Sequence, residues 1–204
     1  MQSSATQDRK IFSDIQVHDG NRKAVEMAMI FVQKWPDVRK GLFFIGPPGT
    51  GKTMLAKAIY KELGGVWVSA NQLLADLRPG GKIHQAKESA EKCYRECRGN
   101  CGVILYRSRP AGSCRYCNAV SRDVLPGISK TRLLFVDDLG THKPTDWAAE
   151  QLYMLFDSRV MPVIATSNYR PDELSERLGH DRIVSRVVGL AAAQELTGED
   201  WRMK

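Results

Sequence analysis

A glycine-rich loop between a predicted strand and a predicted helix constrains this chain more than any other feature. The loop consists of Gly46, Pro47, Pro48, Gly49, Thr50, Gly51, Lys52 and Thr53. Apolar residues at 41–45 predict a short buried strand before it, and helical spacing at 54–63 predicts a helix after it. Glycines let the backbone wrap closely around a phosphate, and a helix N-terminus adds partial positive charge. The pattern predicts binding of ATP or GTP, with Lys52 at the β- and γ-phosphates and Thr53 on Mg²⁺.

Size and composition indicate a globular protein with one domain. The chain has 204 residues, of which 43% are hydrophobic and 26% are charged, and this is enough to form a core. No apolar run reaches the length of a membrane span. Residues 1–10 form a polar tail without the apolar segment of a secretory signal. We therefore expect a cytoplasmic protein with no membrane partner, reduced thiols and a single domain over residues 11–204.

Strands and helices alternate along the chain outside a central segment. Strands are predicted at 41–45, 65–70, 132–136 and 163–166. Helices are predicted from the capping residues 19–21 to about Trp35, and at 54–63, 71–77, 145–156, 171–177 and 182–190. Alternation of this kind predicts an α/β fold with a parallel sheet covered by helices on both faces.

Polar side chains end two of the predicted strands. Asp137 and Asp138 follow an apolar run, and Asn168 follows another. We expect Asp137 to hold Mg²⁺ through water, Asp138 to polarise the attacking water, and Asn168 to orient that water. Adjacent acids also occur in solvated turns, and an Asn before Tyr-Arg-Pro also favours a turn. The phosphate-binding loop favours the catalytic interpretation of all three residues.

Four motifs in this order resemble those of the AAA+ ATPases. They are GPPGTGKT at 46–53, LLFVDD at 133–138, VIATSN at 163–168 and RIVSRVVGL at 182–190. The longer forms LLFVDDLG, ATSNYRPDEL and RIVSRVVGLAAAQELTGEDWR are similar to DnaC-type helicase loaders and IstB-type transposition helpers. The resemblance covers about residues 11–78 and 131–204. It implies a P-loop AAA+ core that hydrolyses ATP with Mg²⁺.

The resemblance also assigns roles to single residues. Residues 46–53 match Walker A, and Asp137 and Asp138 match Walker B, whose second acid is Glu in many AAA+ proteins. Asn168 matches the sensor I position. Asp is one methylene shorter than Glu, so the resemblance bears more directly on nucleotide binding than on the rate of turnover.

Two arginines match functional positions of this family. Arg186 matches the arginine finger, which reaches the site of a neighbouring subunit, and Arg202 matches a sensor II arginine. An exposed helix position is the alternative for Arg186. The finger implies a homo-oligomer that assembles with ATP. A P-loop kinase acting on a small molecule would leave Arg186 and Asn168 without a role.

The resemblance implies a partner as well as a reaction. It favours a helicase-loader-like factor in DNA replication that assembles on DNA and remodels or delivers a replicative helicase. The alternative is an ATP-switched, DNA-binding helper that selects targets for a transposase. Family members of the loader type usually carry an N-terminal domain before the core, whereas about ten residues precede it here.

A basic, cysteine-rich module is predicted at about 79–130, and it departs from the usual family pattern. This segment holds ten of the basic residues against four acidic ones, so it carries +6 of the net charge of +7, and it contains all five cysteines. The spacing predicts tetrahedral Zn²⁺. The predicted ligands are Cys97, Cys101, Cys114 and Cys117, with Cys93 as an alternative ligand. Free packing thiols and a redox or iron–sulfur site are the other interpretations.

The same module is a candidate contact for DNA, single-stranded DNA in particular. Its basic residues are interleaved with Tyr94, Tyr106 and Tyr116. Lysine and arginine supply affinity for phosphates, and aromatic rings can stack on bases. Solvated surface charge is the alternative interpretation.

Overall fold

The computed structural model describes residues 12, 15–78, 128–142, 145–198 and 200. In chain order its elements are α1 (Arg22–Lys34), β1 (Gly41–Ile45), α2 (Lys52–Leu63), β2 (Val66–Ser69), α3 (Ala70–Leu77), β3 (Leu134–Leu139), α6 (Asp146–Asp157), β4 (Val163–Ser167), α7 (Pro171–Leu178), α8 (Asp181–Leu190) and β5 (Ala191–Glu195). None of the helices in these described ranges is long and apolar enough to cross a membrane.

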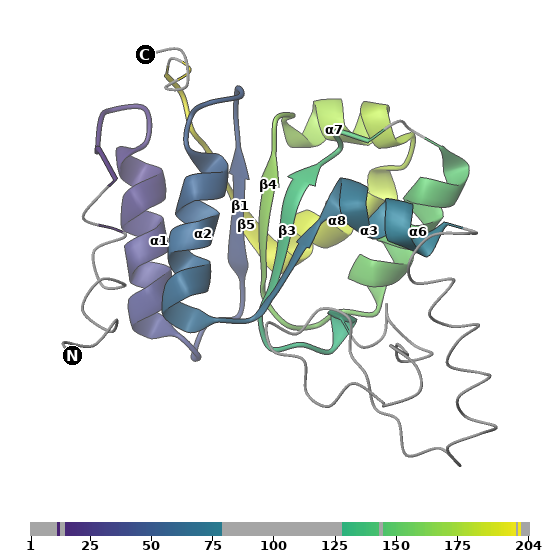
Figure 1. Cartoon of the computed structure of the whole chain (residues 1–204), viewed down its shortest axis with the longest axis horizontal. Helices are drawn as coiled ribbons and strands as arrows, with labels where there is room; N and C mark the ends of the chain where they lie inside the picture. Colours follow the sequence, from purple (N-terminus) through teal and green to yellow (C-terminus); the bar gives the residue numbers. More distant parts are fainter. Residues whose placement is uncertain (1–11, 13–14, 79–127, 143–144, 199, 201–204) are drawn as a thin grey trace, which may run out of the picture.

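The five strands form one parallel sheet in the order β2-β3-β4-β1-β5 (Figure 1). This confirms the predicted α/β class and parallel sheet. Because all strands run the same way, their carboxyl ends meet at one edge of the sheet. The phosphate-binding loop follows β1, and β4 and then β3 are its neighbours on one side. Motifs that are far apart in the sequence therefore end at the same place, as ligand sites do in open α/β sheets.

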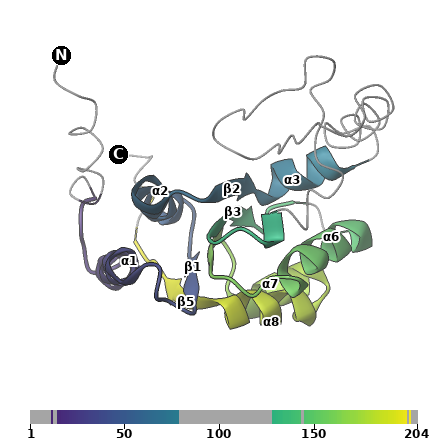
Figure 2. The same ribbon diagram turned by 90° about the horizontal axis from the view of Figure 1, so that it is seen from below.

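Helices cover both faces of the sheet, and the side chains of β1 alternate between them. Leu42 and Phe44 pack on the side of α1 and α2. Phe43 and Ile45 pack in the larger cluster with α3, α6, α7 and α8. Figure 2 shows α1 and α2 on one side of the sheet and α6, α7 and α8 on the other. All five residues of β1 are buried, as expected for a parallel strand covered on both faces.

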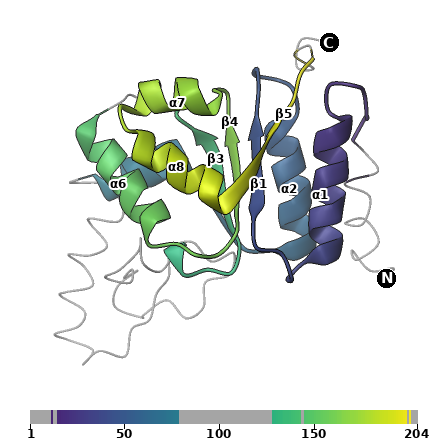
Figure 3. The ribbon, with the colours of Figure 1, turned by 180° about the vertical axis from the view of Figure 1, so that it is seen from behind.

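The structure corrects the sequence prediction at two strands. β3 covers Leu134–Leu139, so it starts two residues later than predicted and includes both aspartates. The strand β5 was not predicted, because Ala, Gln and Glu are poor strand formers. β5 pairs with β1 in a register that runs from Gly41 with Ala191 to Ile45 with Glu195. This pairing holds the segment in an extended conformation that the local sequence does not specify. Figure 3 shows α8 crossing this face of the sheet and leading directly into β5.

A buried arginine fixes the chain just before β3. Arg159 is only 4% exposed, and its guanidinium donates to the carbonyl oxygens of Ser129 at 2.9 Å and Pro162 at 2.6 Å. Burial lowers the pKa of Arg159 to about 10. Arg159 thereby joins the approach to β4 with the approach to β3, the two strands that carry Asn168 and the aspartates.

Candidate nucleotide-binding and hydrolysis site

The loop between β1 and α2 has a backbone that only glycine adopts easily. Gly46, Gly49 and Gly51 have φ angles of 137°, 78° and 92°. A Cβ atom on Gly46 would also lie 2.1 Å from the carbonyl oxygen of Leu196. The glycine spacing in the sequence therefore reflects both conformation and close approach of the segment after β5. The loop ends at Lys52, where α2 begins and its N-terminal N–H groups are available to an anion.

Lys52 is buried at the base of this loop. Its side chain is 5% exposed, and Nζ donates to the carbonyl oxygens of Gly46 at 2.8 Å and Pro47 at 2.6 Å. These contacts hold the ammonium group within the loop that is predicted to bind phosphate. A lysine in this position can exchange carbonyl oxygens for phosphate oxygens without leaving the loop.

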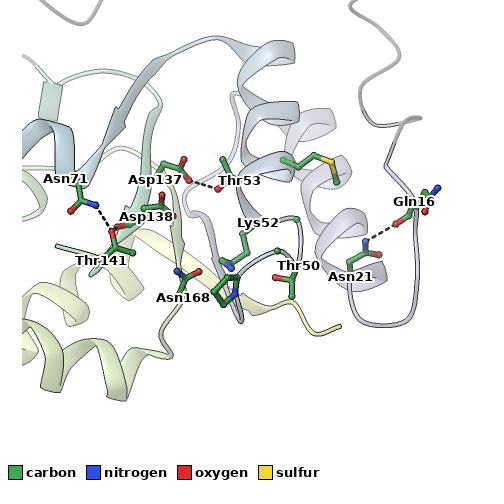
Figure 4. Close-up of a pocket in the computed structure, with 14 residues that line it drawn as sticks. Gln16, Asn21, Thr50, Lys52, Thr53, Asn71, Asp137, Asp138, Thr141 and Asn168 are labelled. Atoms are coloured by element: carbon green, nitrogen blue, oxygen red, sulfur yellow. Dashed lines mark hydrogen bonds between the residues drawn. The ribbon is translucent and has the colours of Figure 1, made fainter. Parts of the chain in front are cut away.

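A hydrogen bond joins the phosphate-binding loop to the end of β3. Thr53 Oγ1 donates to Asp137 Oδ1 at 2.9 Å, as Figure 4 shows. Thr166 Oγ1, from β4, donates to the same oxygen at 2.7 Å. The hydroxyl of Thr53 and the carboxylate of Asp137 are oxygen ligands of the kind that Mg²⁺ prefers. The pair therefore fits a magnesium ion.

Asp138 occupies a strained turn beside this pair. Its φ of 58° is in the left-handed region, which few residues other than glycine adopt but Asp tolerates. The register of β3 and β4 shifts between Val136 and Leu139, so the strand bulges at the two aspartates. The N–H of Asp138 donates to Thr166 Oγ1 at 2.9 Å, and its carbonyl oxygen accepts from Thr141 Oγ1 at 2.8 Å.

These elements line a pocket of about 880 Å³, within the range of small-molecule sites. The lining residues are Gln16, Asn21, Pro48, Gly49, Thr50, Gly51, Lys52, Thr53, Met54, Asn71, Asp137, Asp138, Thr141 and Asn168. Figure 4 shows them converging from α2, β3, the end of β4 and the segment before α1. Lys52, Thr53, Asp137, Asp138 and Asn168 were predicted from sequence, and the fold brings all five together.

Comparisons with known proteins agree with this arrangement. The sequence model of the ATPase family associated with various cellular activities (AAA) matches residues 42–107. The structure of DnaI has 25% sequence identity and a TM-score of 0.60, covering 93% of this chain and 94% of that one. The DnaC helicase loader has 19% identity and a TM-score of 0.57, covering 96% of this chain and 100% of that one.

Two further matches cover only part of the related protein. The structure of a DNA replication initiation factor has 19% identity and a TM-score of 0.55, covering 92% of this chain and 49% of that one. A stretch of 54 residues is 41% identical to Protein SAV of Sulfolobus acidocaldarius, and it spans 24% of this chain and 7% of that protein. The matches at 19% identity show a shared fold.

These findings support the resemblance to AAA+ ATPases of the DnaC/IstB-like group. In this chain the predicted finger lies apart from the pocket. Arg186 is on α8, is not among the residues that line the pocket, and pairs with Asp157 at the end of α6. Arg202 and the predicted zinc ligands Cys97, Cys101, Cys114 and Cys117 lie outside the described residues.

The fold adds pocket residues that no sequence motif indicated. Gln16 and Asn21 line the pocket from the segment before α1. Asn21 is 5% exposed, and its side chain donates to the Gln16 carbonyl oxygen at 2.9 Å and accepts from the His18 N–H at 2.9 Å. The sequence predicted Asn21 among the capping residues, and Asn21 does occupy the N-cap position of α1. Its side chain, however, fixes the preceding segment and makes no capping hydrogen bond.

Asn71 and Thr141 were also missed. Asn71 Nδ2 donates to Thr141 Oγ1 at 2.8 Å, and that hydroxyl in turn donates to the carbonyl oxygen of Asp138. The pair supports the Asp138 turn from the start of α3 (Figure 4). Because 70 positions separate the two residues in sequence, no local pattern could link them.

Proposed function

We propose that this chain binds ATP with Mg²⁺ and hydrolyses it as a helicase-loader-like AAA+ factor in DNA replication. The observation that carries this proposal is the Thr53–Asp137 hydrogen bond, because it closes the two predicted catalytic motifs around one pocket. The likeness to DnaI over nearly the whole of both chains supports the same reading.

In the proposed reaction each residue has one task. Lys52 and the loop N–H groups would bind the β- and γ-phosphates, Thr53 would bind the metal ion, and Asp137 would hold it through water. Mg²⁺ supplies positive charge to phosphate oxygens. Asp138 accepts a hydrogen bond from the attacking water, and Asn168 orients that water. Phosphoryl transfer depends mostly on positioning and charge stabilisation, which is the work that polar groups lining one pocket can do.

We propose that Arg186 completes the site of a neighbouring copy. A guanidinium at the γ-phosphate stabilises the charge of the transition state. Its place on α8, outside the residues that line the pocket of its own chain, favours action across a subunit boundary. Assembly into an ATP-dependent homo-oligomer follows from this sharing of sites.

The proposed protein partner is a replicative helicase, and the nucleic acid on which the protein is proposed to assemble is DNA. One of the structures with a similar fold is that of the DnaC helicase loader. We propose helicase loading for this chain because the likeness to that structure covers 96% of the chain. The basic module at 79–130 is the proposed contact for single-stranded DNA.

The same module is proposed to hold Zn²⁺ through Cys97, Cys101, Cys114 and Cys117. Its sequence spacing supports this proposal, since paired thiolates two to four residues apart are typical of closed zinc sites. Metal analysis of the purified protein tests it directly. Cys114→Ser should release the zinc, and a wild-type protein without zinc would overturn the proposal, with iron in its place indicating an iron–sulfur site.

Nucleotide binding and turnover with Lys52→Ala test the central proposal. We expect loss of both, because the variant removes the positive charge of the phosphate-binding loop. Lys57→Ala is the matched control, because Lys57 is an exposed lysine on the same helix. Equal effects of the two variants would contradict the assignment of the loop.

Capture of partners with the ATP-bound wild-type protein tests the biological role. Recovery of a replicative helicase, dependent on ATP and lost in Lys52→Ala, is the expected result. Recovery of a transposase in place of a helicase would contradict the loader proposal.

A further inference from the structure

We infer that Thr166 is a positioning residue that sets both aspartates of the site, and through them the affinity for Mg²⁺ and the rate of turnover. This inference rests on the proposed ATPase function. Thr166 lies in β4, two residues before Asn168, and its side chain is almost fully buried at 1% exposure. Thr166 lies within the VIATSN motif, but the sequence gives it no role of its own, because a threonine within an apolar run is ordinary for a strand.

The direction of its hydrogen bonds is fixed by chemistry. The backbone N–H of Asp138 can only donate, so Thr166 Oγ1 accepts from it at 2.9 Å. The single hydroxyl proton is then free to be donated to Asp137 Oδ1 at 2.7 Å. One hydroxyl therefore connects the proposed metal-binding carboxylate to the backbone of the residue that positions the water.

For Asp137 the effect is one of orientation. Its Oδ1 accepts from two hydroxyl groups, that of Thr53 at the start of α2 and that of Thr166 in β4. A carboxylate held at one oxygen by two donors also has its second oxygen fixed in direction. Since Mg²⁺ requires nearly ideal geometry, a fixed carboxylate lowers the cost of binding it.

For Asp138 the effect is on the backbone. The residue is held at a φ of 58°, which is unfavourable for most residues other than glycine and small polar residues. The hydrogen bond from its N–H to Thr166 opposes relaxation of this turn. Loss of the hydroxyl would remove the acceptor of this part-buried hydrogen bond and would allow the carboxylate of Asp138 to move.

The next residue supplies a matched control. Ser167 is also fully buried, and its hydroxyl donates to the Leu139 carbonyl oxygen at 2.7 Å and accepts from the Tyr169 N–H at 3.1 Å. These two hydrogen bonds support the same turn through Leu139 and Tyr169 and involve neither aspartate. A role that is merely structural would affect Thr166 and Ser167 variants alike.

The experiment compares Thr166→Val, Thr166→Ser and Ser167→Ala. Three quantities are measured: affinity for a fluorescent ATP analogue in EDTA, the Mg²⁺ concentration that half-saturates its tighter binding, and the turnover number. For Thr166→Val we expect the affinity in EDTA to stay within about twofold of wild type. The half-saturating Mg²⁺ concentration should rise and the turnover number should fall, each by about tenfold. This is the loss expected for one hydrogen bond to a charged group. Thr166→Ser should restore both.

Ser167→Ala should lower the melting temperature and leave the half-saturating Mg²⁺ concentration unchanged. Equal Mg²⁺ dependence in Thr166→Val and Ser167→Ala would overturn the inference. Thr166→Ala also lacks the hydroxyl and replaces Thr166→Val if the latter is not folded at the assay temperature. Wild-type protein that neither binds nor hydrolyses ATP would instead overturn the proposed function, so the two failures are separated by the wild-type measurement.

Discussion

Arg186 on α8 and Asp157 at the end of α6 form an ion pair, with 2.7 Å between Nη2 and Oδ1. Their side chains are 55% and 38% exposed, so the pair lies at the surface. Exposed pairs of this kind contribute about 0–1 kcal/mol to stability. The pair therefore holds the direction of Arg186 more than it stabilises the fold, and it can be exchanged for a contact with a neighbouring copy at small cost.

Arg186→Ala should leave the nucleotide affinity of an isolated subunit nearly unchanged and reduce hydrolysis by about 10³-fold, the lower range for loss of an arginine finger. Asp157→Asn removes the same ion pair and retains the guanidinium, so it controls for the pair itself. We expect it to hydrolyse ATP at close to the wild-type rate. Steady-state turnover at several protein concentrations measures both.

Mixing tests whether sites are shared. Arg186→Ala subunits combined with Lys52→Ala subunits should regain some hydrolysis, because some junctions then join an intact finger to an intact loop. Activity that is independent of protein concentration and unaffected by mixing would contradict a shared site.

Asp138→Asn should keep ATP binding and stop turnover. The amide has the shape of the carboxylate and, like Asp, tolerates the φ of 58° found here, so the turn is preserved while the negative charge is lost. Single-turnover measurements with bound ATP check the result. Normal hydrolysis by a variant that binds ATP normally would sink the assignment of Asp138 as the group that polarises water.

Gly49→Ala should destabilise the protein by about 2–4 kcal/mol and weaken nucleotide binding, because two costs combine at this position. Gly49 has a φ of 78°, and an added Cβ would lie 1.9 Å from Asp200 Oδ1 and 2.7 Å from Asp200 Cα. Gly64→Ala is the control, since Gly64 has a φ of 67° with nothing within 4 Å. It carries only the conformational cost of about 1 kcal/mol. If denaturant unfolding gave equal losses of stability for both variants, the expected clash between the added Cβ and Asp200 would be contradicted.

His142 makes stability sensitive to acid. Burial lowers its pKa below the ordinary value of 6.5, and the nearby guanidinium groups of Arg177 and then Arg78 lower it further. Neither ring nitrogen has a hydrogen-bond partner within the part of the chain that is described. The unfolded chain therefore binds a proton at a higher pH than the folded one does. By linkage, stability is lost as the pH falls below 6.5 towards the lowered pKa of the folded state.

His142→Gln should reduce this loss. We expect a smaller decrease in melting temperature between pH 7.5 and pH 5.5 than in the wild type. His180→Gln, at the exposed N-cap of α8, is the control for removing a histidine as such. An identical pH dependence in the wild type and in His142→Gln would remove His142 as the cause.

Much of the fold and the core of the candidate site could be predicted from sequence because they rest on local patterns. The phosphate-binding loop is contiguous, and the roles proposed for its glycines, Lys52 and Thr53 follow from their spacing along the chain. Asp137 and Asn168 follow apolar runs, and parallel strands place such residues at one edge of a sheet. Alternating elements were enough to predict a parallel sheet with helices on both faces.

The tertiary structure decided what depends on pairing between distant segments. The strand β5 exists because β1 offers it a partner, although its own residues favour a helix at least as well. Thr166 and Thr53 meet at one oxygen of Asp137 only because β3 lies between β2 and β4 with β1 beyond. Hydrogen bonds of this kind depend on strand order and on side-chain direction to within about an ångström. The sequence by itself determined which chemistry is present, and the packing of the sheet determined which groups hold it in place.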